Sequence, residues 1–398
     1  MGTTYHVKWD GDDSVTDDLK LQFEERLLEI NQLMSTYDPN SELSRFNRFD
    51  SKEWFPVSQE TSTVVAAALE MAQTSEGAFD PTVGRLVRLW NFGPDPGSLK
   101  APAAEDVADA MLSVGYQHIE VQSDPPALRK KQEAVELDLS AIAKGYGVDQ
   151  LAQIMRENEI ENYMVEIGGE VRVAGRRPSG GQWNLGIERP DSLTQSLYAT
   201  IELEDEALAT SGDYRNYFVQ DDKRYSHTID PRTGSPVTHQ LASVSVVMED
   251  CMLADAWATT LMVLGSEAGL KLADEHGIQA YLLERNGEAF RELASQTAIG
   301  EFVSLTQVET AEDSGMSPLL STFLLSVTVF LIAIIGLAAG VILSNKTLKG
   351  SCGGVEGTKD EEGRSVCEMC TTPPEECDQF KEKLRQQLKD TQPAEQQS

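Results

Sequence analysis

The chain has 398 residues, 40% hydrophobic and 25% charged, which is enough length and apolar content to bury the cores of more than one domain. This composition excludes a wholly disordered or fibrous protein. Its 65 Asp and Glu residues outnumber 33 Lys and Arg, and the net charge of −32 argues against a nucleic-acid binder because it would repel a polyanion.

Hydrophobic periodicity predicts both helices and strands throughout residues 1–305. The first helix covers residues 16–36, where Phe23, Ile30 and Met34 lie on one apolar stripe. Further helices are predicted at residues 58–76, 104–114, 140–158 and 250–275, and strands at residues 162–173, 183–188, 197–203, 215–220, 242–248 and 278–284. The strands cluster instead of alternating with the helices, which favours an α+β domain over a doubly wound sheet.

A polar linker is predicted at residues 306–317 and a transmembrane helix at residues 318–344. Residues 319–343 are almost wholly apolar, and a helix of this length would extend about 38 Å, enough to cross a bilayer. A buried helix of a soluble domain is the alternative, but its apolar run would be shorter, about 10–14 residues. Residues 345–398 then form a Cys-rich tail.

The charges beside the apolar segment predict its orientation. Lys346 and Lys349 follow it directly, whereas Glu309, Glu312 and Asp313 precede it. The positive-inside rule therefore predicts a single-pass protein of the inner (cytoplasmic) membrane, with a periplasmic large domain and a cytoplasmic tail. The N-terminal residues have neither the basic nor the apolar region of an export signal, so we expect either a start further upstream or an inverted orientation.

Cysteines are concentrated in the tail. Cys251 stands alone in the first 344 residues and is expected to be a small buried apolar residue. The tail cysteines are separated by fourteen, two and six residues, and they are Cys352, Cys367, Cys370 and Cys377. They could hold a metal or form disulfides, and a cytoplasmic location disfavours disulfides. The spacing fits neither a zinc ribbon nor a ferredoxin, which leaves the type of metal open.

Common nucleotide-binding signatures, such as the P-loop and GxGxxG, do not occur in the sequence. One helical pattern places Asp255 and Thr259 four residues apart on the same face, where they could supply two oxygen ligands to Mg²⁺. The alternative is a surface aspartate near a threonine that bonds to its own helix.

Two further segments could carry chemistry. Residues 138–145 lead from a strand into a helix, whose N-terminal dipole and Lys144 suit an anion, although an ordinary capped helix with a solvated lysine is the alternative. In residues 226–234, His227 could act as a general base or bind phosphate, and Arg232 could bind phosphate or brace the loop. The same residues are also favourable for a simple turn.

Eight segments of the large domain together resemble one family. They are residues 1–5, 34–37, 41–47, 77–84, 138–145, 210–214, 227–234 and 255–259, and they look like the ApbE family of FAD:protein FMN transferases. The resemblance covers about residues 1–305 and implies an α+β fold related to the T-fold, with FAD bound between its parts.

The resemblance also implies a reaction that depends on Mg²⁺. A threonine hydroxyl of another protein attacks the FMN-side phosphorus of FAD, FMN becomes linked through a phosphoester, and AMP leaves. By the same resemblance, Asp255, Thr259 and the backbone carbonyl of Ala141 would hold Mg²⁺, and His227 would assist the attack. The residues implied to line the FAD pocket are Met1, Tyr37, Ala78, Phe79, Asp80, Asp138, Lys144 and Ile229.

The C-terminal part resembles a second family. Residues 316–319, residues 349–354 and the later cysteines look like NqrM, a maturation protein of the sodium-pumping NADH:quinone oxidoreductase. That resemblance implies iron supply through the cysteines. Because the ApbE family flavinylates subunits of the same pump, the fusion would join two maturation steps. The expected partners are therefore acceptor subunits of a flavin-dependent membrane redox pump.

Other readings of both parts stay open. A flavin carrier would bind FAD without turnover, and a Mg²⁺-dependent FAD pyrophosphatase would release free FMN and AMP. In the tail, a structural metal site or a redox thiol cluster competes with iron delivery. No segment matches the acceptor pattern Asp-x-[Ser/Thr]-[Ser/Thr]-Gly-Ala-Thr, so we do not expect the chain to flavinylate itself.

Overall fold

The computed structural model describes residues 2–11, 15–94, 97, 100–191, 196–305 and Ser326. Its contacts divide the chain into two compact units, Met1–Glu312 and Asp313–Ser398, and every helix and strand with described bounds belongs to the first. Met1, the predicted linker, the predicted membrane span apart from Ser326, and the four tail cysteines lie outside the described residues. Within the described part of the chain, no helix has the length and apolar character needed to cross a membrane.

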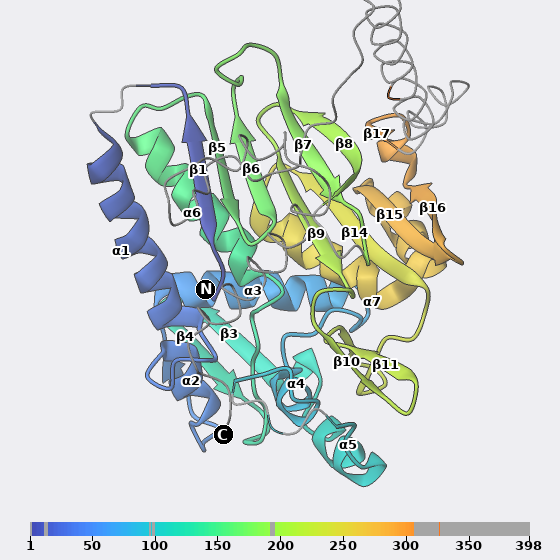
Figure 1. Ribbon diagram of the computed structural model, residues 1–398. Coiled ribbons are helices and arrows are strands. Elements are labelled where there is room, and N and C mark those ends of the chain that lie inside the picture. Colours follow the sequence, from blue (N-terminus) through green and yellow to red (C-terminus); the bar gives the residue numbers. More distant parts are fainter. Residues whose placement is uncertain are drawn as a thin grey trace, which may run out of the picture. The chain divides into compact units, whose positions relative to one another are not determined.

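The centre of the large unit is a seven-stranded sheet in which every pair of neighbours is antiparallel (Figure 1). The strand order is β1 (Tyr5–Trp9), β5 (Tyr163–Ile167), β6 (Glu170–Ala174), β9 (Ala207–Gly212), β14 (Leu241–Met248), β15 (Gln279–Asn286) and β16 (Ala289–Ala294). Nearly all of β14 is buried, because it is a central strand with both faces covered.

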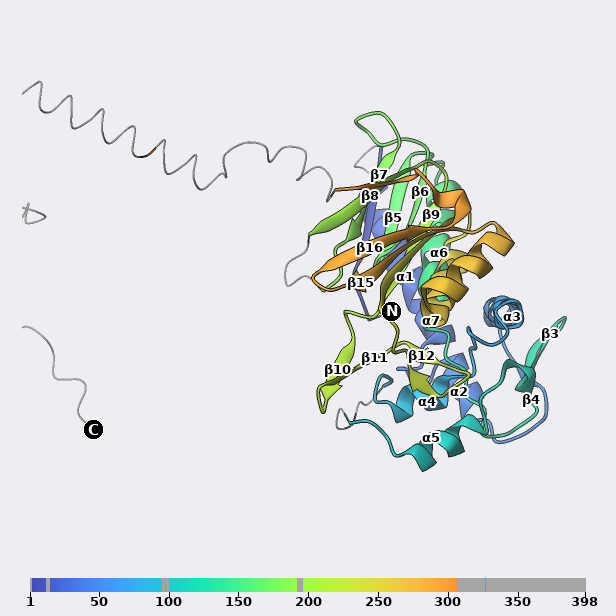
Figure 2. The same cartoon turned by 90° about the vertical axis from the view of Figure 1, so that its right-hand side faces the viewer.

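Helices cover one face of this sheet, and a second sheet covers the other (Figure 2). The helices are α1 (Thr16–Met34), α6 (Ala143–Glu157) and α7 (Cys251–His276), with α3 (Gln59–Thr74) packed against α7. The second sheet has the order β17 (Phe302–Ser304), β8 (Leu197–Leu203), β7 (Trp183–Glu188). Trp183 and Ile201 from this sheet pack against Leu283 of the large sheet and close a separate apolar core.

Smaller elements lie beyond one end of the large sheet (Figures 1 and 2). They are helices α2 (Glu42–Asn47), α4 (Gly84–Leu89) and α5 (Ala104–Met111), and strands β2 (Phe55–Pro56), β3 (Ile119–Ser123) and β4 (Pro126–Lys130). Two hairpins join them, β10 (Tyr217–Gln220) with β11 (Lys223–Ser226), and β12 (Ile229–Asp230) with β13 (Ser235–Pro236). Trp90, Phe218 and Ile229 belong to a core shared by α4, α5 and the hairpins, whereas α2 and strands β2 to β4 pack into the main core beneath the large sheet.

All five predicted helices are present, but two predicted elements need correction. Residues 162–173 are two strands and not one, because Gly168 and Gly169, with φ of 62° and 105°, turn the chain back between β5 and β6. The helix predicted at residues 250–275 is interrupted at Gly265, whose φ of 77° is not helical. Asp149 of α6 supplies the cap of α7, since its carboxylate accepts the N–H groups of Cys251 and Met252 at 3.2 and 2.9 Å.

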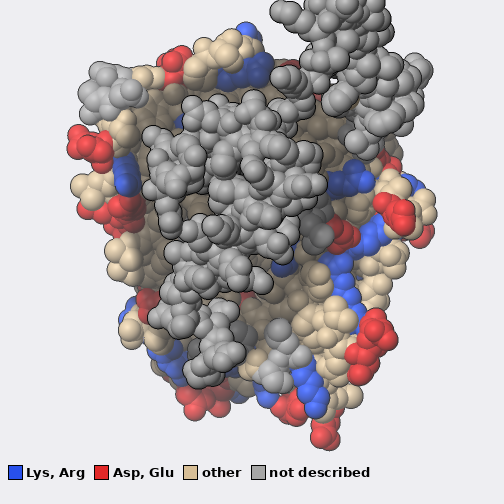
Figure 3. All heavy atoms as spheres, in the orientation of Figure 1, with Lys and Arg blue, Asp and Glu red and all other residues tan. Residues whose placement is uncertain are grey.

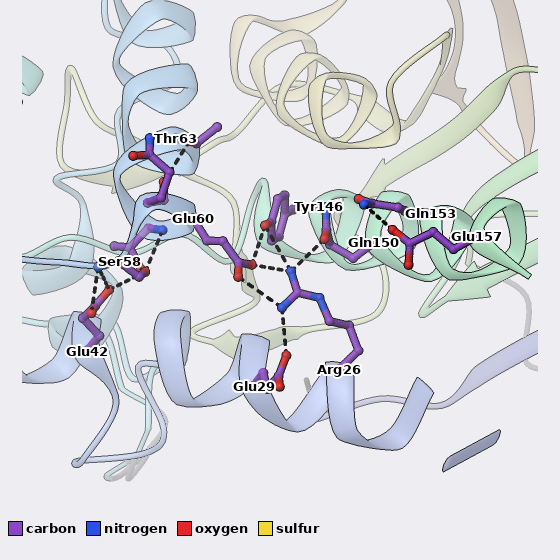
Figure 4. A network of polar contacts seen from close by, with 12 residues as sticks. Arg26, Glu29, Glu42, Ser58, Glu60, Thr63, Tyr146, Gln150, Gln153 and Glu157 are labelled. Carbon is purple, nitrogen blue, oxygen red and sulfur yellow. Dashed lines mark hydrogen bonds and ion pairs between the residues drawn. The ribbon is translucent and has the colours of Figure 1, made fainter. Parts of the chain in front are cut away.

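A half-buried polar network ties three helices together (Figure 4). The guanidinium of Arg26 on α1 donates to Glu60 of α3, at 3.1 Å from Nη1, and to Gln150 of α6 at 2.7 Å. The hydroxyl of Tyr146 on α6 donates to Glu60 Oε2 at 2.6 Å. The three helices are therefore joined by directional bonds as well as by apolar packing.

Candidate functional site

One cavity of about 490 Å³ lies among the elements that the sequence analysis singled out. Its walls come from residues far apart in the chain, including the start of α6, the turn between β5 and β6, the end of β9 and the first half of α7. Every described residue that the family resemblance implies for the site lines this cavity, and they are Tyr37, Ala78, Phe79, Asp80, Asp138, Ala141, Lys144, His227, Ile229, Asp255 and Thr259. The fold thus brings the predicted set into one space.

The start of α6 meets α7 at a close crossing. The N–H of Gly145 donates to Asp255 Oδ2 at 3.1 Å. A Cβ atom at Gly145 would lie 2.2 Å from the carbonyl oxygen of Cys251, so only glycine permits this approach. In a regular helix the Gly145 N–H would be directed to the carbonyl of Ala141, and its bond to Asp255 leaves that carbonyl available.

Three buried or half-buried charges form a row beside this crossing. Lys144 Nζ contacts Glu170 Oε1 and lies 3.9 Å from Asp255 Oδ1. Burial raises the pKa of Asp255, an effect that Lys144 and the Gly145 N–H partly offset. Burial also raises the pKa of Glu170, to about 7. For Lys144, burial lowers the pKa, but Asp255 and Glu170 raise it further, so the ammonium stays charged.

Thr259 lies one turn after Asp255 on α7, and its hydroxyl is 3.0 Å from the hydroxyl of Ser211 on β9. Neither Ser211 nor Glu170 was among the predicted site residues. A signal for Glu170 is visible in retrospect, because it directly follows the Gly168–Gly169 turn that points it toward the cavity.

His227 directly follows the β10–β11 hairpin. Its Nδ1 lies 3.1 Å from the carbonyl oxygen of Asn216, which also accepts the His227 backbone N–H at 3.0 Å. A carbonyl only accepts, so Nδ1 carries the hydrogen and Nε2 is the basic nitrogen of the neutral ring. Surrounding protein atoms lower the pKa of His227, which favours the neutral form near pH 7.

Two further charged loop residues, Arg232 and Asp80, form hydrogen bonds within the loops and so hold the loops in place. Arg232 donates from its backbone N–H, Nε and Nη2 to Asp230, each at 2.9 Å, which supports the loop-bracing alternative. Asp80 accepts hydrogen bonds from the N–H and hydroxyl of Thr82 and from the N–H of Tyr116. Its carboxylate thereby fixes the loop that carries Ala78 and Phe79.

The rest of the predicted pocket combines apolar and polar surface. Ala78, Phe79 and Ile229 are buried, whereas the side chain of Tyr37 is 65% exposed. Asp138 accepts the N–H of Ser140 at 2.8 Å. Partial desolvation by nearby protein atoms and the negative charge of Asp138 raise the pKa of Tyr37, so its hydroxyl stays protonated.

The residues at the crossing fit a magnesium ion. Across the described ranges, no group of three or more His, Cys, Asp or Glu side chains is placed to hold a metal. The predicted ligands are of a different kind, namely one carboxylate, one hydroxyl and the backbone carbonyl that the Gly145 bond leaves available. Such hard oxygen donors, completed by water or phosphate oxygens, suit Mg²⁺.

A mixed helix-and-sheet fold with a cavity of apolar, aromatic and hard-oxygen surface, and a histidine on its wall, is the arrangement expected of an enzyme with a small-molecule site. Comparison with known families agrees with this class. Residues 1–282 match the ApbE family, and the chain belongs to it. Residues 341–389 match a second family, described as (Na+)-NQR maturation NqrM.

Relatives cover the large unit almost completely. A FAD:protein FMN transferase of Vibrio cholerae is 44% identical over 75% of this chain and 89% of its own length. A solved structure of the flavin transferase ApbE from Vibrio cholerae superposes with a TM-score of 0.69, is 41% identical, and covers 75% of this chain and 96% of its own. The apo form of a Pseudomonas stutzeri flavinyl transferase ApbE superposes with a TM-score of 0.68, is 38% identical, and covers 75% of this chain and 92% of its own.

Proposed function

We propose that this chain is a FAD:protein FMN transferase that uses Mg²⁺ to move FMN from FAD onto a threonine hydroxyl of an acceptor protein. Membership of the ApbE family supports the general activity. The observation that carries the chemistry is the single cavity in which Asp255, Lys144 and His227 face the same space. Metal ligands, a cation and a base are the groups that phosphoryl transfer requires.

Each group has a defined task in this proposal. His227 Nε2 takes the proton of the threonine hydroxyl as its oxygen bonds to the FMN phosphorus, and the bond to the departing AMP phosphate breaks. Lys144 places its ammonium near the phosphates. Asp255, Thr259 and the Ala141 carbonyl would hold Mg²⁺, which neutralises charge on the pyrophosphate oxygens when it is bound.

For the C-terminal part, we propose a role in the same maturation process. The NqrM match supports a link to the sodium-pumping NADH:quinone oxidoreductase, whose subunits would be the acceptors. The four tail cysteines would bind iron for the assembly of that pump. The apolar segment at residues 318–344 would anchor the protein in the inner membrane with the flavin transferase unit outside and the tail inside.

The test is a transfer reaction with the full chain, FAD, Mg²⁺ and a candidate acceptor subunit, followed by mass spectrometry of the acceptor. We expect the acceptor to gain one FMN less one water, with release of AMP, and we expect EDTA to stop the reaction. Asp255→Asn should lose transfer by at least about 100-fold while the fold persists. Asp250→Asn, at an exposed carboxylate nearby, is the control and should retain transfer.

Other products would identify the competing functions. Free FMN and AMP without a labelled acceptor would indicate a pyrophosphatase, in which water takes the place of the threonine hydroxyl. Tight FAD binding without any turnover would indicate a flavin carrier. Normal transfer by Asp255→Asn would contradict the magnesium site.

A further inference from the structure

Glu170 has one carboxylate oxygen without a partner. It is the first residue of β6, its relative exposure is 2%, and it lines the cavity. Its Oε1 is held by Lys144 Nζ. Its Oε2 is buried and makes no hydrogen bond to any described residue.

Like Glu170, each other carboxylate on the cavity wall has a protein donor, but none of them has a buried oxygen that lacks a partner among the described residues. Both oxygens of Asp80 accept hydrogen bonds from loop groups, and Asp138 accepts the N–H of Ser140. Asp255 accepts the Gly145 N–H, and Glu188 is paired with Arg215. Among the buried side-chain atoms of the described residues that lack a partner, Glu170 Oε2 is the one on this wall.

A buried carboxylate oxygen without a hydrogen bond is costly, so such an atom indicates a missing donor. For the ionised carboxylate, which the neighbouring Lys144 ammonium favours, the missing group cannot be a phosphate oxygen, because that atom is itself an acceptor and carries like charge. FAD offers neutral donors away from its phosphates, namely the hydroxyls of the ribityl chain and ribose, the amino group of adenine, and the imide N–H of the flavin ring. We propose that Glu170 Oε2 accepts a hydrogen bond from one of these neutral donors and so orients bound FAD, an inference that rests on the proposed function.

A glutamine at this position tests the proposal because it replaces one hydrogen-bond acceptor of the side chain with a donor. Lys144 requires an acceptor, so the single oxygen of the amide stays with Lys144. The atom that faces the cavity then becomes an NH₂ donor. It would oppose a hydroxyl, amino or imide donor of FAD, whereas it would favour a phosphate oxygen. The direction of the change in affinity therefore identifies the kind of group that Glu170 meets.

The experiment measures FAD affinity of the full chain by flavin fluorescence in EDTA, so that metal binding does not contribute. We expect Glu170→Gln to weaken FAD binding by about tenfold or more, the size of one hydrogen bond to a charged group. Glu120→Gln is the control, since that carboxylate is paired with Arg129 and does not line the cavity, and the FAD affinity of this variant should change less than about threefold.

Three results would overturn the proposal. They are unchanged affinity of Glu170→Gln, tighter binding by this variant, and a loss confined to the affinity for Mn²⁺, used as a probe for Mg²⁺ and titrated without FAD. Glu170→Ala, which removes both oxygens and adds no donor, gives a second measurement if the glutamine variant does not fold, and normal FAD binding by it would contradict the proposal. Failure of the wild-type chain to bind FAD even when Mg²⁺ is present would instead contradict the proposed function.

Discussion

At the scale of single residues, the two nitrogens of His227 have different surroundings, and this difference predicts how the residue acts. Nδ1 is held by the Asn216 carbonyl, and Nε2 remains for the acceptor hydroxyl. We expect His227→Ala to lower the transfer rate by about 100-fold or more, a usual range for loss of a general base, while FAD affinity changes less than about threefold. Parallel measurements of transfer rate and FAD affinity check this.

The pH dependence provides an independent check on His227. Because its pKa is lowered below the ordinary value of 6.5, the basic form persists to more acidic pH, and the acid limb of the transfer rate should lie below pH 6.5. Arg232→Gln is the control, since Arg232 is committed to Asp230, and its rate should stay near that of the wild type. An equal loss of rate and FAD affinity in His227→Ala would make the histidine a binding or structural residue.

Part of the site could be predicted from the sequence, and part could not. Asp255 and Thr259 could be predicted because their spacing is local, four residues apart on one helix face. Ala141 could be predicted only from the family resemblance, since the side chain of alanine cannot coordinate a metal. Glu170 and Ser211 reach the cavity through strand pairing, and the Gly168–Gly169 turn before Glu170 indicates a reversal of the chain but not which strands become neighbours.

At the scale of elements, helices were predicted more completely than strands. The periodicity of α1, α3 and α6 is long and regular, so their bounds agree with the prediction to within a few residues. The short helices α2 and α4 have only six residues each and provide too little periodicity. Strands β1, β9 and β16 also went unpredicted, because the sheet order that pairs them is set by tertiary contacts and not by local pattern.

The network around Arg26 leads to a prediction about the docking of α1 on α3 and α6 (Figure 4). Arg26→Met keeps the aliphatic length of the side chain but removes its hydrogen bonds to Glu60 and Gln150. We expect the free energy of unfolding to fall by about 2 kcal/mol, because a half-buried carboxylate loses its main partner. Urea unfolding of the wild type and the variant measures this difference.

The same network should respond to pH in a defined direction. Burial raises the pKa of Glu60, but hydrogen bonds from Arg26 and Tyr146 outweigh it and lower the pKa below the ordinary value of 4.5. The stabilisation is therefore present above pH 4.5 and is lost as the pH falls through the lower, folded-state pKa. Lys20→Met, at an exposed ion pair on the same helix, is the control, and a pH-independent difference for Arg26→Met would contradict the prediction.

At the scale of the whole molecule, charge and sequence order indicate how the two family matches are joined. On the face in Figure 3, acidic and basic side chains of the described residues stand side by side. The ApbE match ends at residue 282 and the NqrM match begins at residue 341, and the apolar segment at residues 318–344 follows the first match and overlaps the start of the second. A membrane anchor at this position would keep a flavin transferase and a cysteine tail on opposite sides of one bilayer.

This arrangement predicts the accessibility of each part in cells. The full chain should stay with membranes after alkaline carbonate washing, and Leu331→Arg with Ile334→Arg should release it, since each charge at the centre of a span costs about 2.5–3.5 kcal/mol. In spheroplasts, added protease should degrade the large domain. A membrane-impermeant maleimide should label the tail cysteines only after permeabilisation, and Cys251 adds little background because it is fully buried. Tail labelling in intact spheroplasts, with a protected large domain, would invert the orientation that Lys346 and Lys349 predict.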